Sequence, residues 1–534
     1  MGEPITYLSE EERIIGSLNS LGPLDHYFAK RLLKDHFSEE KALFLSTLMR
    51  ISRDGHLCWK TSTAPEFPDS ILEEGKDLCP KAPVIKQGQR YYLQRNWVYE
   101  TYLLEQVKRL RNLSPLPCHD EEIFYRELGQ SNLLPMQKDV VKTAFQNAFS
   151  LICGGPGTGK TYTASILVKL LLRSKKKEKY KVILAAPTGK AAFHLQSVLK
   201  EEMESTTLHR LLKVVQGKNR LFSNRKLDAD LVIVDEASMI DVPLLAQLLE
   251  SIGDHTRLVL MGDPDQLPPV EAGSLFAEMA ALFSTPLKKS MRTELSCLQL
   301  LGEEINRGEF TRREHLLNWP FDSDLSQKLF EALNPVISWQ EPDPQLCLNQ
   351  INQFRVLGAL RQGPYGIDAL NQKIVAEMSA RICPGQWWAI PIMITTNEPS
   401  QNLYNGTCGI LIGKSRGRVH LRDGTAYFPE KIPFRFLPRF EIAFCLSIHK
   451  SQGSEFEKVL ALFPEGSDCF GREALYTAVT RAKKEVQIVA VEGVIQAMLA
   501  QRSRKISGFT ERYTYSTESF ESSLAIGVQS FETP

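Results

Sequence analysis

The chain has 534 residues, which is too long for one hydrophobic core and predicts roughly three to four domains. Apolar residues make up 43% and charged residues 24%, as in an ordinary globular protein, and no apolar run reaches the ~18 residues that a membrane span needs. The net charge of +1 does not by itself indicate a protein that coats nucleic acid, although a locally positive groove is compatible with it.

Residues 1–115 are predicted to form a mainly helical domain. Apolar side chains recur three and four residues apart in 12–18, 27–33 and 41–50, which is the period of an amphipathic helix. No catalytic pattern occurs in this region. We therefore expect it to dock to a partner or to the remainder of the chain.

Residues 121–285 are predicted to form an α/β domain, because short continuous apolar runs alternate there with helical patterns. Such runs are typical of parallel strands that are buried on both faces of a sheet. A polar and basic stretch within this domain, 213–227, is predicted to be a small inserted hairpin. The apolar runs are 150–153, 182–186, 231–234 and 257–261.

A second α/β domain is predicted from 286–390 and 442–505, with a β-rich insertion between them. Within 391–441, three Xaa-Gly turn signals follow one another at the spacing of a small barrel. Residues 506–534 are rich in Ser, Thr and Glu and are predicted to be loosely ordered, although their scattered aromatic residues leave a docking role open.

The sequence Gly154-Gly-Pro-Gly-Thr-Gly-Lys-Thr161 follows an apolar strand and precedes a helical pattern, as a phosphate-binding loop does. Its glycines let backbone N–H groups turn toward phosphate oxygens, and the helix N-terminus adds partial positive charge. Lys160 is expected to reach the β- and γ-phosphates of ATP, and the Thr161 hydroxyl to ligand Mg²⁺. The residues expected to bind the nucleotide here are Gly154, Gly155, Pro156, Gly157, Thr158, Gly159, Lys160 and Thr161.

Two further strand ends are expected at the same edge of the sheet. Asp235 and Glu236 follow the strand at 231–234, so Asp235 is expected to hold Mg²⁺, and Glu236 to orient or deprotonate the attacking water. Gln266 follows the strand at 257–261, where its amide can hydrogen-bond a γ-phosphate. A polar turn stiffened by prolines is the alternative interpretation of this last segment alone.

The segment Gly262-Asp-Pro-Asp-Gln-Leu-Pro-Pro-Val270 resembles motif III of superfamily 1 helicases, in the branch typified by RecD, and other motifs of that branch occur in order. The resemblance covers about 133–493. It implies two RecA-like P-loop NTPase motor domains with parallel sheets, an SH3-like β-barrel insertion at 391–441 and a partner-docking N-terminal domain. The other motifs are Leu133-Leu-Pro-Met-Gln-Lys138, Ala185-Ala-Pro-Thr-Gly-Lys-Ala191, Ser290-Met-Arg-Thr293, Ser447-Ile-His-Lys-Ser-Gln-Gly-Ser-Glu-Phe456 and Leu475-Tyr-Thr-Ala-Val-Thr-Arg-Ala-Lys483.

The same resemblance implies roles for residues outside the phosphate loop. Gln137 is expected to read the adenine, and Glu455 to hold the ribose. Arg292 and Arg481 are expected to be arginine fingers that reach the γ-phosphate from the second lobe. The residues expected to contact DNA are Pro187, Thr188, Lys190, His449 and Ser451.

The implied function is that of an ATP-dependent 5′–3′ DNA helicase, the α subunit of an exodeoxyribonuclease V (RecBCD) complex in double-strand break repair and recombination. Its expected partners are single-stranded DNA, double-stranded DNA ends, and RecB-like and RecC-like subunits. A stand-alone RecD-like helicase, and a structural subunit that binds nucleotide without motor activity, are the alternatives. Because no secretory signal or closely spaced cysteine pair is visible, we expect a cytoplasmic protein with no membrane contact, and the resemblance implies that it is bacterial and nucleoid-associated.

Overall fold

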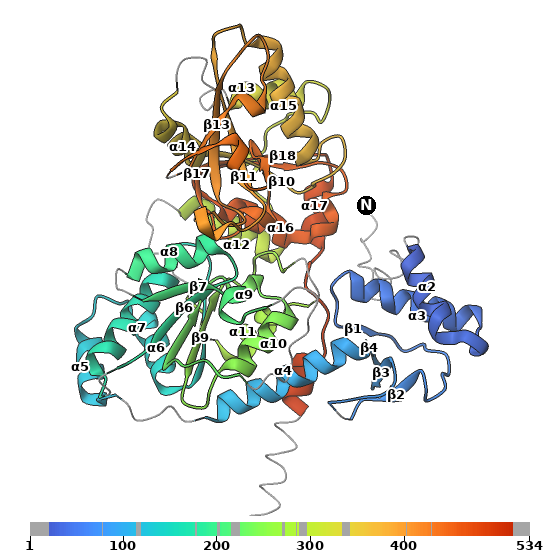
Figure 1. Cartoon of the computed structure of the whole chain (residues 1–534). Helices are drawn as coiled ribbons and strands as arrows, with labels where there is room; N and C mark the ends of the chain where they lie inside the picture. Colours follow the sequence, from blue (N-terminus) through green and yellow to red (C-terminus); the bar gives the residue numbers. More distant parts are fainter. Residues whose placement is uncertain are drawn as a thin grey trace, which may run out of the picture.

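The computed structural model contains an N-terminal domain, two lobes built on parallel sheets, and an antiparallel sheet on the second lobe, as Figure 1 shows. The two parallel sheets confirm the predicted α/β class. Within 213–227, the proposed hairpin, residues 215–224 lie outside the described part of the chain. The structure describes residues 21–76, 78–113, 119–176, 179–199, 203–214, 225–269, 273–284, 286–287, 296–333, 342–401, 403–428 and 430–515.

The N-terminal domain combines helices with a four-stranded sheet of order β1-β4-β3-β2, so it is less purely helical than the sequence suggested. Alternation places Tyr91 and Tyr92 of β4 on opposite faces, and both are buried there against aromatic rings, Phe44 and Trp97 respectively. The elements are α2 (Pro23–Leu33), α3 (Glu39–Arg53), β1 (Cys58–Lys60), β2 (Leu72–Glu74), β3 (Val84–Gln87), β4 (Arg90–Leu93) and α4 (Gln94–Asn112).

The first lobe is a five-stranded parallel sheet of order β5-β9-β8-β6-β7. Its strands are β5 (Phe149–Cys153), β6 (Val182–Ala186), β7 (Glu204–Thr207), β8 (Leu231–Val234) and β9 (Arg257–Gly262). Its helices are α5 (Glu121–Gln130), α6 (Pro135–Gln146), α7 (Lys160–Ser174), α8 (Gly189–Leu199), α9 (Leu208–Leu211), α10 (Val242–Ser251) and α11 (Phe276–Phe283).

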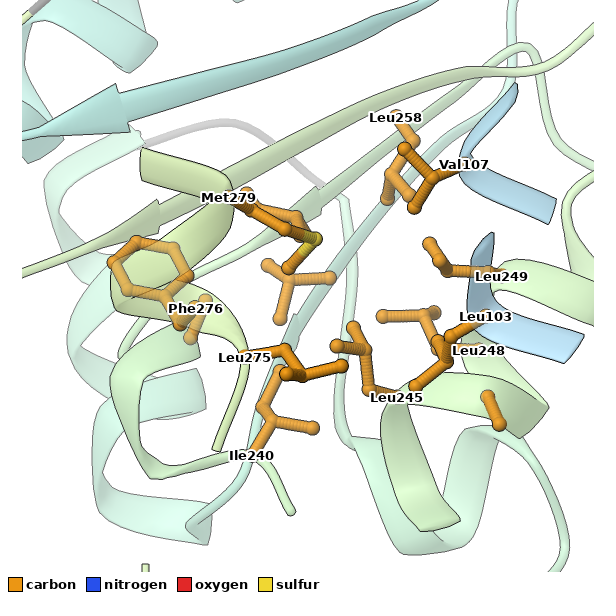
Figure 2. Packing of buried hydrophobic residues seen from close by; sticks show 14 of the residues in the cluster. Leu103, Val107, Ile240, Leu245, Leu248, Leu249, Leu258, Leu275, Phe276 and Met279 are labelled. Carbon is orange, nitrogen blue, oxygen red and sulfur yellow. The ribbon is translucent and has the colours of Figure 1, made fainter. Parts of the chain in front are cut away.

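Each face of this sheet is covered by a separate hydrophobic core. In β8, Val232 and Val234 pack into one cluster, while Leu231 and Ile233 pack into the other. Figure 2 shows the first cluster, where Leu103 of α4 lies beside Leu248 of α10, and Val107 of α4 lies beside Leu258 of β9. The long helix of the N-terminal domain is therefore part of the core of the first lobe.

The second lobe is a four-stranded parallel sheet of order β16-β10-β17-β18. Its strands are β10 (Phe354–Gly358), β16 (Cys445–Ser447), β17 (Phe456–Phe463) and β18 (Ala482–Ala490). Its helices are α12 (Ser296–Arg307), α13 (Leu325–Ala332), α14 (Pro344–Gln353), α15 (Ile367–Arg381), α16 (Gly471–Thr480) and α17 (Val494–Ala500).

Between β10 and β16 the chain forms a five-stranded antiparallel sheet of order β14-β13-β12-β11-β15. This sheet spans 387–442, slightly more than the predicted insertion at 391–441, and Trp388 packs into the core that the sheet shares with the second lobe. The SH3-like identity stays a prediction. The strands are β11 (Trp387–Ile394), β12 (Cys408–Lys414), β13 (Thr425–Tyr427), β14 (Lys431–Pro433) and β15 (Phe440–Ile442).

After α17 the chain returns to the N-terminal domain, where it runs beside α4 in Figure 1. Residues 509–515 are helical, and Phe509 is fully buried in the core shared by α4 and the first lobe. The part of the expected loose tail that the structure describes, 506–515, is thus held by packing. The remainder, 516–534, lies outside the described residues.

Candidate nucleotide-binding site

The loop after β5 is wound tightly against the first sheet. Gly157 and Gly159 have φ of +73° and +82°, in the left-handed region that favours glycine. A Cβ on Gly154 would lie 2.8 Å from the backbone oxygen of Leu287, so no side chain fits there without a shift of backbone. Because α7 begins at Lys160, its N-terminus faces the same space as the loop. This arrangement suits phosphate oxygens.

Lys160 lies over this loop, where its Nζ donates to the backbone oxygens of Gly154 at 2.6 Å and Gly155 at 3.0 Å. It lines a cleft of about 1660 Å³ together with Thr161, Asp235 and Glu236. The structure therefore brings together the phosphate loop and the acidic pair, which lie 75 residues apart in the sequence.

The two carboxylates lie at the end of β8 in a buried environment. The Asp235 carboxylate accepts a hydrogen bond from the Glu236 backbone N–H at 2.8 Å. Burial raises the pKa of both carboxyls, and the neighbouring Asp235 raises the pKa of Glu236 further, while Arg481 and Lys160 oppose that rise. Glu236 has φ of +53°, which is uncommon for a residue with a side chain and is typical of functional sites.

The opposite wall of the cleft comes from the second lobe. Arg481, at the end of α16, is 3% exposed, and its Nη1 donates to the Ser454 backbone oxygen at 3.2 Å. Glu455 also lines the cleft, with its carboxylate 3.8 Å from Lys483 Nζ. Lys190 of the first lobe donates from Nζ to Ser454 Oγ at 2.8 Å, so the two lobes are in direct contact at this site.

The segment after β9 also bridges the lobes. Leu267 N–H donates to Thr477 Oγ1 of α16 at 2.9 Å, and Gln452 Nε2 donates to the Leu267 backbone oxygen at 2.8 Å. Gln266, which was predicted to meet the γ-phosphate, lines the cleft beside them. Thr477 and Gln452 carried no signal of this contact in the sequence, because it depends on how the lobes pack together.

Two predicted nucleotide contacts are placed differently from the others. Gln137 is 2% exposed; its Oε1 accepts from Leu134 N–H at 3.0 Å, and its Nε2 donates to the Thr158 backbone oxygen at 3.4 Å. One end of this amide thus braces the phosphate loop and the other caps α6, and contact with adenine stays a prediction. Arg292 lies outside the described residues.

The predicted DNA contacts are only partly brought together. Lys190 lines the cleft, whereas the Thr188 hydroxyl accepts from Ala191 N–H at 3.3 Å near the start of α8. Ser451 is fully buried, and its hydroxyl donates to the Ile448 backbone oxygen at 2.7 Å, so its side chain is occupied inside the protein.

The other two predicted DNA contacts lie on different lobes, Pro187 on the first and His449 on the second. Pro187, directly after β6, is half-buried. His449 is half-buried with its ring edge-on to Phe470 at 5.9 Å, and burial lowers its pKa, with Lys505 lowering it further.

A second cavity, of about 720 Å³, lies between the second lobe and the antiparallel sheet. Arg361, Arg439 and Lys450 give it three cationic side chains, of which Arg361 and Lys450 both pair with Glu441. This cluster could not be predicted from the sequence, because its members are up to 89 positions apart and come from different elements.

Within the described part of the chain, one group of side chains has the chemistry of a metal site: Cys297, Glu314 and His315. None of these three residues lines the cleft, and Arg312 Nη1 lies 3.5 Å from Cys297 Sγ, where its charge opposes a cation. At the cleft itself, the Thr161 hydroxyl and the Asp235 carboxylate form the oxygen donor set that Mg²⁺ prefers. No described helix has the length and apolar character needed to cross a membrane.

Two family models match the two lobes. Residues 137–272 match a model described as an AAA domain, and residues 442–489 match one described as a UvrD-like helicase C-terminal domain. Among solved structures, the Pif1 helicase from Bacteroides in complex with ADP-AlF3 and ssDNA is similar with a TM-score of 0.40 and 17% identity, over 73% of this chain and 98% of that one.

Curated relatives match almost the whole chain. The RecBCD enzyme subunit RecD of Mycobacterium tuberculosis is 31% identical over 95% of this chain and 98% of its own length. Its counterpart from Mycolicibacterium smegmatis is 29% identical over 92% and 97%. The ATP-dependent RecD2 DNA helicase of Deinococcus radiodurans is 30% identical over 72% of this chain and 54% of its own length. The chain belongs to the RecD family of RecBCD enzyme subunits.

Proposed function

We propose that this protein is an ATP-dependent 5′–3′ DNA helicase subunit of a RecBCD-type complex in the bacterial cytoplasm. One observation carries the proposal: Lys160 and Glu236 of the first lobe and Arg481 of the second lobe line a single cleft. A helicase needs ATP hydrolysis that depends on the relative position of two lobes. A structural subunit has no need of a buried arginine at that junction.

The residues of the cleft have complementary chemical roles. The loop N–H groups and Lys160 bind the phosphates, while Thr161 and Asp235 hold Mg²⁺, which neutralises charge on the β- and γ-phosphate oxygens. Glu236 orients the attacking water and accepts its proton, a role that its raised pKa suits. Arg481 stabilises the charge that develops on the transferred phosphoryl group. Glu455, which lines the same cleft, is proposed to hold the ribose.

The proposed DNA track crosses the tops of the two lobes. Lys190 at the junction, and Arg361, Arg439 and Lys450 of the second cavity, supply positive charge along such a path. Contacts of this kind bind phosphates and do not read sequence. A track that follows the backbone is what a motor on single-stranded DNA needs.

The proposed partners are RecB-like and RecC-like subunits, and the N-terminal domain offers a surface for one of them. Four large apolar side chains are exposed on α2, on α3 and on the turn between them, which is unusual for a surface without a partner. They are Leu24, Tyr27, Phe37 and Leu43.

The proposal is tested by ATPase and unwinding assays on DNA with a 5′ or a 3′ single-stranded tail. We expect single-stranded DNA to stimulate ATP hydrolysis, and unwinding only from the 5′ tail. ATP turnover that is slow and indifferent to DNA at every salt concentration favours the nucleotide-binding structural subunit instead. Full activity of a lone chain, with no co-purifying subunits in its native mass, favours a stand-alone helicase.

A further inference from the structure

The side chain of Asp263 connects the two lobes behind the cleft. It is 1% exposed and begins the segment that leaves β9. Its Oδ2 accepts two hydrogen bonds, one from Gln266 Nε2 at 3.1 Å and one from the Tyr476 hydroxyl at 3.0 Å. Because Tyr476 belongs to α16, a single carboxylate oxygen joins a first-lobe amide to a second-lobe hydroxyl.

Tyr476 is placed to act as a permanent donor. It is 6% exposed, and a Cβ on Gly155 would lie 3.0 Å from its hydroxyl oxygen, so the hydroxyl also abuts the phosphate loop. Burial, with Asp263 adding to it, raises the pKa of Tyr476 well above its ordinary value. The hydroxyl therefore keeps its proton at every working pH and holds the carboxylate in one position.

That carboxylate fixes which end of the Gln266 amide is free. Asp263 Oδ2 accepts both hydrogen bonds, so it faces the NH₂ group of Gln266, and the carbonyl oxygen of that amide lies on the other side. Gln266 Oε1 is a buried acceptor without a hydrogen-bond partner in the described part of the chain. Phosphate oxygens are acceptors too, whereas an attacking water is a donor. The free end of Gln266 therefore suits the water.

We propose that Tyr476 is a positioning residue for ATP hydrolysis. Through Asp263 it orients the Gln266 amide so that Oε1 aligns the attacking water. The inference rests on the proposed ATPase function and deepens it. It also makes the alignment of water conditional on the seating of α16 of the second lobe, because the hydroxyl that sets the orientation comes from there.

The test compares two tyrosine-to-phenylalanine variants in the full chain. Tyr476→Phe removes the proposed hydrogen bond, and we expect it to lower the DNA-stimulated kcat by about tenfold, the effect of one hydrogen bond to a charged group. The KM for ATP should change by less than about twofold, because the interaction is needed only when water attacks. Tyr92→Phe is the matched control, since the Tyr92 hydroxyl is also buried and donates to a carboxylate, that of Glu100, at 3.1 Å. It should leave kcat unchanged.

A double mutant distinguishes positioning from a merely structural role. If Tyr476 acts through Gln266, then Tyr476→Phe should cause no further loss of kcat in a Gln266→Ala background. Asp263→Asn is a second test of positioning. The NH₂ group of the new asparagine can donate to Gln266 Oε1, which reverses the orientation of the Gln266 amide. We expect its kcat to fall as far as that of Gln266→Ala.

Three results would overturn the inference: a Tyr476→Phe enzyme as fast as wild type, multiplicative losses in the double mutant, or an equal loss of kcat in Tyr92→Phe. Thermal unfolding of each variant separates loss of the hydrogen bond from loss of the fold. A wild-type protein without DNA-stimulated ATPase refutes the proposed function together with this inference. Wild-type stimulation with an unaffected Tyr476→Phe refutes this inference alone.

Discussion

At the scale of single residues, Arg481 offers the sharpest test of the two-lobe site. It is buried in the wall that the second lobe contributes, and arginine fingers typically supply a factor of about 10³–10⁵ in rate. We expect Arg481→Ala to lower kcat by about 10³ or more while ATP still binds, as measured by steady-state ATPase and equilibrium nucleotide titration. Arg416→Ala is the control, because that side chain is 82% exposed. A loss of less than about tenfold in Arg481→Ala contradicts the assignment.

The acid limb of the pH profile tests Glu236. Its pKa is raised by burial and by Asp235, and a general base works only when deprotonated. Activity should therefore be full above the raised pKa and fall as the pH drops through it, with a midpoint above the ordinary value for a glutamate. The measurement is kcat against pH at saturating ATP and DNA. Glu236→Gln should remove nearly all turnover but retain nucleotide binding. Wild-type activity that persists below the ordinary glutamate pKa excludes this role.

Residue positions that follow directly from strand ends could be predicted from the sequence. Lys160, Asp235 and Gln266 each come shortly after an apolar run, and parallel strands bring their carboxyl ends to one edge. The buried roles of Gln137 and Ser451 could not be predicted, because a motif does not show whether its polar group faces a ligand or a backbone oxygen. Tyr476 and Asp263 were unpredictable as a pair for another reason: they are 213 positions apart and meet only across the lobes.

At the scale of elements, the phosphate loop depends on the absence of a side chain at Gly154. A Cβ there would meet the Leu287 backbone oxygen at 2.8 Å and Thr158 Oγ1 at 2.7 Å, so Gly154→Ala must move the loop. Overpacking of this kind costs about 1–3 kcal/mol, and we expect it to appear mainly as a raised KM for ATP. Steady-state ATPase and thermal unfolding measure the two effects.

The control for that element is Gly129→Ala, in α5 of the same lobe. No atom lies within 4 Å of a Cβ on Gly129, and alanine favours a helix over glycine by up to about 1 kcal/mol. This variant should keep its KM and unfold at the same temperature or slightly higher. If Gly154→Ala and Gly129→Ala change the KM for ATP and the unfolding temperature equally, then close packing of the loop does not explain why glycine stands at position 154.

The bounds of helices and strands could be predicted where a continuous apolar run marks them, and less well where the strands are short. Four parallel strands of the first lobe lie close to their predicted apolar runs, for example β8 at Leu231–Val234, whereas β7 was not predicted. The sheet of the N-terminal domain was underestimated, because β1 and β2 are three residues long and gain their stability from partners elsewhere in the chain. Short strands give almost no periodic signal.

At the scale of the whole molecule, residues 502–513 connect the second lobe to the first lobe and to the N-terminal domain. Ser503 N–H donates to Glu473 of α16 at 2.7 Å, and Thr510 Oγ1 donates to Glu278 of α11 at 2.8 Å. Leu57 of the N-terminal domain donates to the Ile506 backbone oxygen at 2.8 Å. Residues 502–513, here called the strap, therefore form a continuous peptide connection that limits how far the second lobe can move relative to α4. The Ser-, Thr- and Glu-rich composition of 506–534 did not predict this, because a few buried contacts hold the segment.

A buried ion pair between Arg512 and Glu100 of α4 holds this strap in place. Glu100 is fully buried and accepts from Arg512 Nη1 at 3.0 Å, from Gly508 N–H at 3.0 Å and from Tyr92. Arg512→Ala leaves that carboxylate without its cation, and breaking a buried pair from one side costs about 3–5 kcal/mol.

We expect Arg512→Ala to lower the free energy of unfolding by that amount in chemical denaturation, and Glu100→Gln combined with Arg512→Ala to recover a large part of it. Arg504→Ala, on the same strap but 55% exposed, is the control and should cost less than about 1 kcal/mol. Equal losses in the single and double variants would show that packing of Phe509, and not the charge of Glu100, secures the strap. Because the strap joins all three bodies, the unfolding transition of Arg512→Ala should also become broader, as the N-terminal domain and the second lobe begin to melt separately.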